Sequence, residues 1–122
     1  MSEADNQEIV RAMVAALNRG DLDEFESYYA DDVAITVTGS GHIFQGRAAV
    51  RRWLDDVFDV FDGFVNDVVG IYADDDHVVL EVLARGDLTR EWRGMGPDPD
   101  WRNPEVYVYR LADGLIVEGR GY

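Results

Sequence analysis

The sequence predicts an α+β domain in which helices pack on one face of a curved, antiparallel sheet. In the first half of the chain, apolar residues recur at helical spacing in three segments. The second half instead alternates apolar and polar residues in runs that short polar turns separate. The 122 residues suit one domain, and no repeat or linker divides them. We therefore expect a single domain over residues 1–122.

Three helices are expected, over about 5–19, 21–32 and 46–62. Each has one apolar stripe, and capping residues or glycines mark its ends. The third stripe is the clearest, and it consists of Val50, Trp53, Leu54, Val57, Phe58 and Phe61.

The strands are expected where β-branched and aromatic residues alternate with polar ones. These runs are 33–38, 64–73, 77–90, 105–111 and 115–122, with one short strand near 42–45. Asp113 and Gly114 indicate a tight hairpin before the last strand. The segment Gly94–Pro104 contains all three prolines and is expected to be a loop.

Charge excludes several classes of partner. The chain has 25 acidic residues against 11 arginines, no lysine, and a net charge of −14. Nucleic acids and anionic membranes need clustered cations, so we expect neither as a partner. The absence of cysteine excludes disulfides and thiol catalysis. With no apolar stretch near the ~20 residues of a membrane span and no signal sequence, a cytoplasmic location is expected.

The acidity has two explanations. An aspartate-rich, lysine-free surface stays hydrated at high salt, where ions screen its self-repulsion, as in halophilic proteins. Alternatively, the anionic surface faces a cationic partner.

Several local phrases, in order along nearly the whole chain, resemble the nuclear-transport-factor-2-like superfamily. This group includes SnoaL-like polyketide cyclases, ketosteroid isomerases and limonene-epoxide hydrolases. The phrases cover residues 14–23, 29–33, 44–50, 106–114 and 116–118. The resemblance implies a cystatin-like cone, with a curved sheet wrapped around three helices. It also implies an internal apolar pocket for a small-molecule ligand and a homodimer formed through the sheet.

Not all of the chemistries of these relatives fit this sequence. At the positions of the ketosteroid isomerase tyrosine, base and oxyanion-hole aspartate, this chain has Met13, Val37 and Tyr107. The resemblance therefore does not imply that proton shuttle. Tyr107 remains a candidate hydrogen-bond donor.

The limonene-epoxide hydrolase pattern is half present. Arg85-Gly86-Asp87 matches its Arg-x-Asp unit, in which the arginine orients a carboxylate that takes a proton from water. The second aspartate of that pattern corresponds to Gly121. In SnoaL-like cyclases, which close a ring by an intramolecular aldol step, the acid lies on the last strand. Gly119 and Gly121 occupy the matching positions here, so an acid must come from elsewhere, such as Asp87 or Glu105.

The candidate catalytic residues are thus Asp87 as base, Arg85 as its orienting partner and Tyr107 as donor. Each has a structural alternative, either an exposed ion pair or aromatic packing. The candidate ligand contacts are His42, Trp53, Glu105, Tyr109, Gly119 and Gly121. Trp92 and Trp101 would form a lid or pack the loop between them. With two distant histidines and no cysteine, we expect no metal site and no cofactor.

Three functions stay open at this point. One is acid/base catalysis of a cyclisation, isomerisation or hydration. Another is binding of a ligand without catalysis. The third is a dimerisation module whose own side chains fill the cavity.

Overall fold

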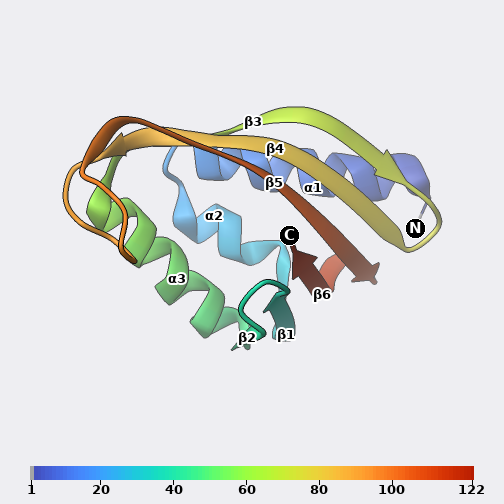
Figure 1. The fold of residues 1–122 in the computed structure, drawn as a ribbon. Coiled ribbons are helices and arrows are strands. Elements are labelled where there is room, and N and C mark those ends of the chain that lie inside the picture. Colours follow the sequence, from blue (N-terminus) through green and yellow to red (C-terminus); the bar gives the residue numbers. More distant parts are fainter. Residues whose placement is uncertain (1) are drawn as a thin grey trace.

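The computed structural model describes residues 2–122, in which three helices and six strands follow the order α1, α2, β1, β2, α3, β3, β4, β5, β6. Their bounds are α1 Glu3–Asn18, α2 Leu22–Ser27, β1 Tyr29–Val37, β2 His42–Gln45, α3 Arg47–Val60, β3 Phe61–Ala73, β4 His77–Leu88, β5 Asp98–Ala112 and β6 Leu115–Gly121. The elements form one curved, open sheet with the helices on its inner side (Figure 1). This is the α+β class that the sequence predicts.

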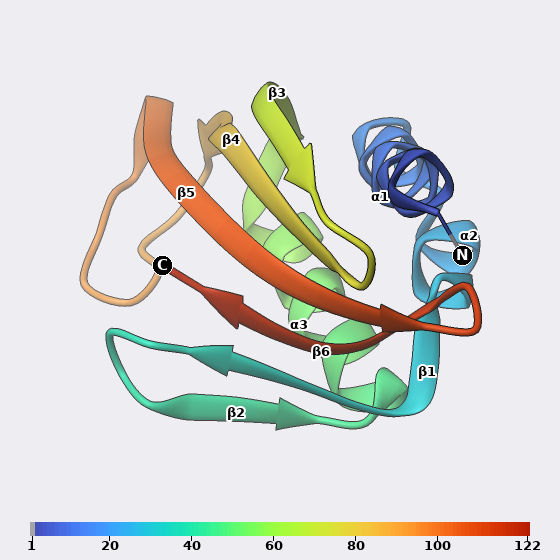
Figure 2. The same cartoon turned by 90° about the vertical axis from the view of Figure 1, so that its right-hand side faces the viewer.

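The sheet has the strand order β2-β1-β6-β5-β4-β3. Figure 2 shows the strands side by side in this order, with α3 behind them. One pair differs from the expected antiparallel arrangement, because β1 and β6 run parallel, with Val37 opposite Gly121. Most of the chain lies between these strands, so no hairpin sets their relative direction.

The second helix is shorter than expected. Asp21 caps it by accepting a hydrogen bond from the Glu24 backbone N–H at 3.0 Å. The helix ends at Ser27, and Tyr29 already belongs to β1, opposite Ile116 of β6. Pairing with the last strand thus replaces the final helical turn that the apolar spacing suggested.

The proline-rich segment is also different from the expectation. Residues 98–104 form the first half of β5, which pairs with β4 as far as Asp98 opposite Leu88. The pairing of β5 with β6 begins only at Tyr107, opposite Gly121. This first half of β5 is therefore an edge, where Pro99 and Pro104 need no neighbour on their second side.

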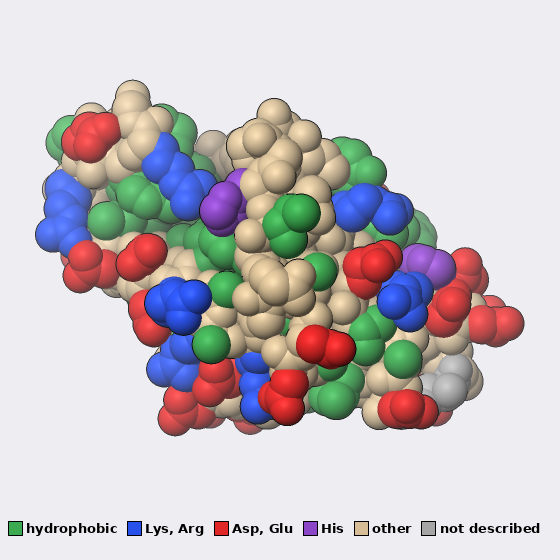
Figure 3. All heavy atoms as spheres, turned by 90° about the horizontal axis from the view of Figure 1, so that it is seen from below, with side chains coloured by type: hydrophobic (Ala, Val, Ile, Leu, Met, Phe, Trp, Pro, Cys, Tyr) green, Lys and Arg blue, Asp and Glu red, His purple; other side chains and the backbone are tan. Residues whose placement is uncertain are grey.

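The core lies between the helices and the inner face of the sheet. On β4, burial alternates strictly, so that Val78, Leu80, Val82 and Ala84 are all at most 2% exposed. Acidic and basic side chains are scattered over the face that Figure 3 shows. Among residues 2–122, no helix has the length and apolarity that crossing a membrane requires.

Candidate functional site

A cavity of about 420 Å³ lies between the inner face of the sheet, α1 and α3. Its walls are mostly apolar: Met13 and Leu17 come from α1, and Trp53, Leu54 and Val57 from α3. Apolar cavities of several hundred Å³ with a few polar groups are typical of small-molecule sites.

Strand β5 supplies the polar groups on one wall. Asn103, Glu105, Tyr107 and Tyr109 are two residues apart, so their side chains leave the same face of the strand. All four line the cavity. Their cross-strand partners on β4 are Ala84, Val82, Leu80 and Val78, the buried row of that strand. The alternation along β4 thus fixes which face of β5 points inward.

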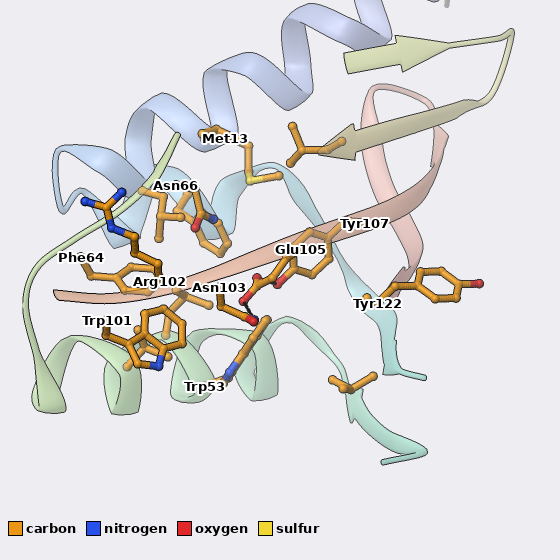
Figure 4. Close-up of a pocket in the computed structure, with 18 of the residues that line it drawn as sticks. Met13, Trp53, Phe64, Asn66, Trp101, Arg102, Asn103, Glu105, Tyr107 and Tyr122 are labelled. Carbon is orange, nitrogen blue, oxygen red and sulfur yellow. Dashed lines mark hydrogen bonds between the residues drawn. The ribbon is translucent and has the colours of Figure 1, made fainter. Parts of the chain in front are cut away.

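The Glu105 carboxylate has two donors within this row. The Tyr107 hydroxyl donates to Oε1 at 2.7 Å, and the Asn103 side-chain amide donates to Oε2 at 2.9 Å. Figure 4 shows the three side chains pointing toward one another near Trp53. Since each carboxylate oxygen has its own donor, the half-buried Glu105 side chain is held in one orientation on the cavity wall.

Burial is the main cause of the pKa shifts at the tyrosines. It raises the pKa of Tyr107 well above its ordinary value, and the nearby Glu105 carboxylate raises it further. Burial likewise raises the pKa of Tyr109, whose ring stacks parallel to that of Tyr107 with centroids 5.7 Å apart. Tyr107 therefore remains a protonated donor at neutral pH.

Asn66 brings a second polar group into the cavity from β3. Its Oδ1 is buried and has no hydrogen-bond partner among the described residues. Its backbone is held by Asn18 of α1, whose side chain accepts from the Asn66 N–H at 2.8 Å and donates to the Asn66 carbonyl at 2.9 Å. A buried acceptor without a donor is costly, so this oxygen destabilises the fold, while other atoms of Asn66 line the cavity.

All three tryptophans of the chain line the cavity. Trp101 packs on Phe61 with centroids 4.8 Å apart, and Trp92 packs on Phe61 at 5.4 Å. The two tryptophans thus pack against the core and form a wall of the cavity. Tryptophan emission consequently reports on the occupancy of this cavity.

Arg85 and Asp87 lie elsewhere, contrary to the sequence-based interpretation. Both are exposed, on the face of β4 opposite its buried row. Arg85 does not orient Asp87, because its Nε donates to Asp67 Oδ2 of the neighbouring strand at 2.5 Å. Neither residue lines the cavity. The two do share one face of β4, as their spacing implies, but it is the outer face.

The other sequence candidates divide between the cavity and its surroundings. Gly121 lines the cavity, whereas Gly119 packs under Tyr109 and Ile35, where an added Cβ would lie 2.9 and 2.7 Å from these side chains. Each glycine therefore makes room for a tyrosine ring. His42 lies outside, in a groove next to the cavity, and its ring packs edge-on against Phe44 with centroids 4.4 Å apart.

Sequence reasoning did not identify Asn66, Asn103 or Arg93 as cavity residues. Asn103 is two residues before Glu105, and its side chain so leaves the same face of β5. This could not be predicted, because the sequence predicts a loop over residues 94–104. Asn66 has the parity of Phe64 on β3, which was a usable signal. No periodic pattern in the sequence identifies Arg93 as a cavity residue, because it lies between two strands.

One cluster of potential metal ligands occurs within residues 2–122. It consists of Asp74, Asp76 and His77 at the β3–β4 turn, with ligand atoms within 4.8 Å of one another. Both aspartates are exposed, and the cluster lies away from the cavity. Hydrogen bonds within the turn already engage Asp74, which accepts from the backbone N–H of His77 at 2.9 Å.

Comparison with solved structures shows the same fold in several bacterial proteins. A proposed polyketide cyclase from Xanthomonas campestris is 27% identical, with a TM-score of 0.86 over 98% of this chain and 90% of that one. IdmH, a proposed polyketide cyclase from Streptomyces antibioticus, is 22% identical, with a TM-score of 0.84 over 96% and 90%.

A Catenulispora acidiphila protein with a ketosteroid isomerase-like fold, solved with trimethylamine, is 21% identical. Its TM-score is 0.78, over 94% of this chain and 84% of that one. A search of curated proteins finds no match. The SnoaL-like domain family model matches residues 10–119. The chain therefore belongs to the family of SnoaL-like domains.

Proposed function

We propose that this SnoaL-like domain binds a small, largely apolar organic ketone in its cavity and catalyses acid/base chemistry on it, with Glu105 as the proton acceptor and donor. The observation that carries the proposal is the half-buried Glu105 carboxylate on the wall of a mostly apolar cavity, held by Tyr107 and Asn103 at 2.7 and 2.9 Å. Glu105 thereby takes the role of base that the sequence suggested for Asp87, and Tyr107 keeps the role of hydrogen-bond donor.

The chemistry is of the cyclase type. Glu105 takes a proton from the carbon next to a carbonyl group, and the C–H electron pair becomes an enolate. The enolate carbon attacks a second carbonyl carbon of the same molecule, which forms a C–C bond. The resulting alkoxide takes the proton back from Glu105. The cavity contributes by folding the ligand so that its two reacting carbons meet.

Asn66 and Tyr107 supply the polar contacts of the ligand. Asn66 lines the cavity, and its side-chain amide group donates a hydrogen bond to a ligand oxygen. The Tyr107 hydroxyl, which remains protonated, can turn from Glu105 to an oxygen on which negative charge develops. The ligand class is therefore a compact hydroxylated polyketone or a related ring system.

The test uses β-tetralone, a small bicyclic ketone with exchangeable protons next to its carbonyl group. Binding is followed by tryptophan emission, and exchange of these protons in deuterated water by NMR. Wild type should accelerate the exchange, and Glu105→Gln should remove roughly a hundredfold or more of the acceleration while still binding the ketone. Asp87→Asn is the control, because Asp87 is exposed on the outer face, and it should exchange as wild type does.

The second candidate function is ligand binding without catalysis. It is favoured by Gly121, which stands where related cyclases keep an acid. The same experiment separates the two functions. Binding of β-tetralone with no exchange above that of buffer supports the non-catalytic protein, and equal exchange by wild type and Glu105→Gln rules out Glu105 as the base.

We also propose that the outer face of the sheet forms a homodimer. Tyr72 is 58% exposed on β3, and it lies opposite Val79 of β4. Val69, on the same strand, is 68% exposed. Analytical ultracentrifugation should give a dimer for wild type and a monomer for Tyr72→Asp, whereas a monomeric wild type would contradict the proposal.

A further inference from the structure

Arg93 occupies the boundary between two hollows. It lines the internal cavity, and it also lines a groove next to it that His42, Phe44, Gln45 and Arg52 border. Trp53 is the other residue common to both hollows, and Phe44 stacks on it with centroids 4.9 Å apart. Figure 3 shows the face seen from below, where basic side chains and a histidine gather beside a hydrophobic hollow.

The side chain of Arg93 is exposed and stacks on one aromatic ring. Its guanidinium carbon lies 4.5 Å from the centre of the Trp92 ring, in cation–π contact. Its backbone has a φ of +51°, a conformation that costs energy for any residue other than glycine. Strained backbone of this kind is concentrated at binding sites. The loop thus presents Arg93 in a defined position.

Among residues 2–122, Arg93 also has no carboxylate partner within 4.0 Å. Seven of the eleven arginines lie within 4.0 Å of a carboxylate oxygen. Within residues 2–122, the four without such a partner are Arg52, Arg93, Arg102 and Arg120. Of these, Arg93 alone borders both hollows. In a chain with 25 acidic residues, an arginine at such a boundary without a carboxylate partner has its guanidinium donors available to an anionic group.

The acids of the same loop are engaged elsewhere, and two further acids line the groove. Glu91 accepts a hydrogen bond from the backbone N–H of Gly94 at 2.7 Å. Asp98 accepts from the N–H of Asp100 at 2.9 Å. In the groove, Asp55 pairs with Arg51 at 3.1 Å, and Asp56 faces the same groove as Arg52. Among residues 2–122, neither these acids nor Glu105 of the cavity lies within ion-pair distance of Arg93.

We propose that the ligand is an organic carboxylate, whose apolar body fills the cavity and whose carboxylate binds Arg93 where the cavity meets the groove. This inference rests on the proposed ligand-binding function and narrows its substrate class to acids. Arginine suits the role, because its planar guanidinium donates two parallel hydrogen bonds to a carboxylate. Arg52 adds positive potential on the groove side.

Two probes of nearly the same shape test the proposal, a naphthoate and the matching uncharged naphthamide, titrated by calorimetry. Wild type should bind the naphthoate more tightly than the naphthamide. Arg93→Gln should weaken naphthoate binding by roughly ten- to hundredfold, as for a hydrogen bond to a charged group, and leave naphthamide binding unchanged. Arg93→Lys should retain part of the preference.

Arg120→Gln is the matched control, because Arg120 also lacks a carboxylate partner among residues 2–122 but borders neither hollow. It should bind both probes as wild type does. Equal affinity of wild type for both probes, or an undiminished preference in Arg93→Gln, would overturn the carboxylate proposal alone. Failure of wild type to bind either probe would contradict the proposed function as well.

Discussion

The Cβ position of Gly121 faces the ring of Tyr107, so that a methyl group there would lie 3.0 Å from Cε1 and 3.3 Å from Cδ1. This contact is too close for the ring to stay where it is. Because Gly121 of the last strand has no side chain, the Tyr107 ring can lie where its hydroxyl donates to Glu105. Gly121 thus contributes to the site by its shape.

Gly121→Ala should displace the Tyr107 ring and weaken the hydrogen bond to Glu105. We expect slower exchange of β-tetralone and a loss of about 1–3 kcal/mol in stability, as for overpacking of a core. Gly39→Ala is the control for stability alone, because nothing lies within 4 Å of its added Cβ, although Gly39 also lines the cavity. Thermal unfolding and the exchange assay measure both effects. A Gly121→Ala protein as stable and active as wild type would show that the ring moves freely.

Tyr107→Phe should lower the exchange rate by roughly tenfold, because it removes a donor to a charged group, while ketone affinity changes less. The ring and its stacking on Tyr109 remain. Tyr72→Phe is the matched control, since Tyr72 lies on the exposed outer face of β3. An equal loss in both variants would assign the effect to something other than the Glu105 contact.

Asn66→Leu should raise the melting temperature, because it replaces an unpartnered buried acceptor by an apolar group of similar shape. Asn18→Leu should have the opposite sign, since Asn18 makes two hydrogen bonds to the backbone of β3. Circular dichroism on heating compares the two variants with wild type. A lower melting temperature for Asn66→Leu would mean that Oδ1 has a partner in solution.

Stability should fall as the pH rises above about 10, the ordinary pKa of tyrosine. Burial raises the pKa of Tyr29, Tyr107 and Tyr109, so the unfolded chain loses these protons at lower pH than the folded protein. The folded state then binds more protons, and each tyrosine should lower the free energy of unfolding by about 1.4 kcal/mol per pH unit. Below this range, the contribution is fully present.

Chemical denaturation at a series of alkaline pH values measures this slope. Tyr109→Phe should reduce the slope of unfolding free energy against pH by the contribution of one tyrosine, about 1.4 kcal/mol per pH unit. An unchanged slope in that variant would contradict the assignment to buried tyrosines.

Added salt should raise the melting temperature if the net charge of −14 destabilises the fold by self-repulsion. Each kcal/mol of relieved repulsion should add roughly 3–6 °C for a chain of this size. The exposed ion pairs, such as Arg47 with Asp31, weaken in salt but contribute little. A melting temperature that does not rise in molar salt would instead favour a cationic partner for the acidic surface.

Periodic patterns predicted most of the fold, because local spacing decides which element forms and which face it buries. They did not predict the parallel pairing of β1 with β6, since that contact joins segments far apart in the chain. They also missed the first half of β5, where prolines signal a loop unless the strand is known to be an edge.

For the site, the sequence indicated the inward row of β5 but misplaced Arg85 and Asp87. The information was present, because Val78, Leu80, Val82 and Ala84 make the even-numbered face of β4 the apolar one. The interpretation of Arg85 and Asp87 as site residues followed their similarity to the Arg-x-Asp motif and not their odd-numbered positions on β4. Arg93 could not be predicted, since its place between the cavity and the groove depends on the three-dimensional path of its loop, whereas Asn66 shares the parity of Phe64.

The parallel contact between β1 and β6 also has a consequence for how the protein is made. When β1 has already left the ribosome, β6 has not yet been synthesised. The side of β1 that will pair with β6 is therefore unpaired at that time. The pairing of β1 with β6 therefore forms late. It joins residues far apart in the sequence, and topologies with such contacts fold slowly. Until then, the exposed edge of β1 is a surface that chaperones or other nascent chains can bind.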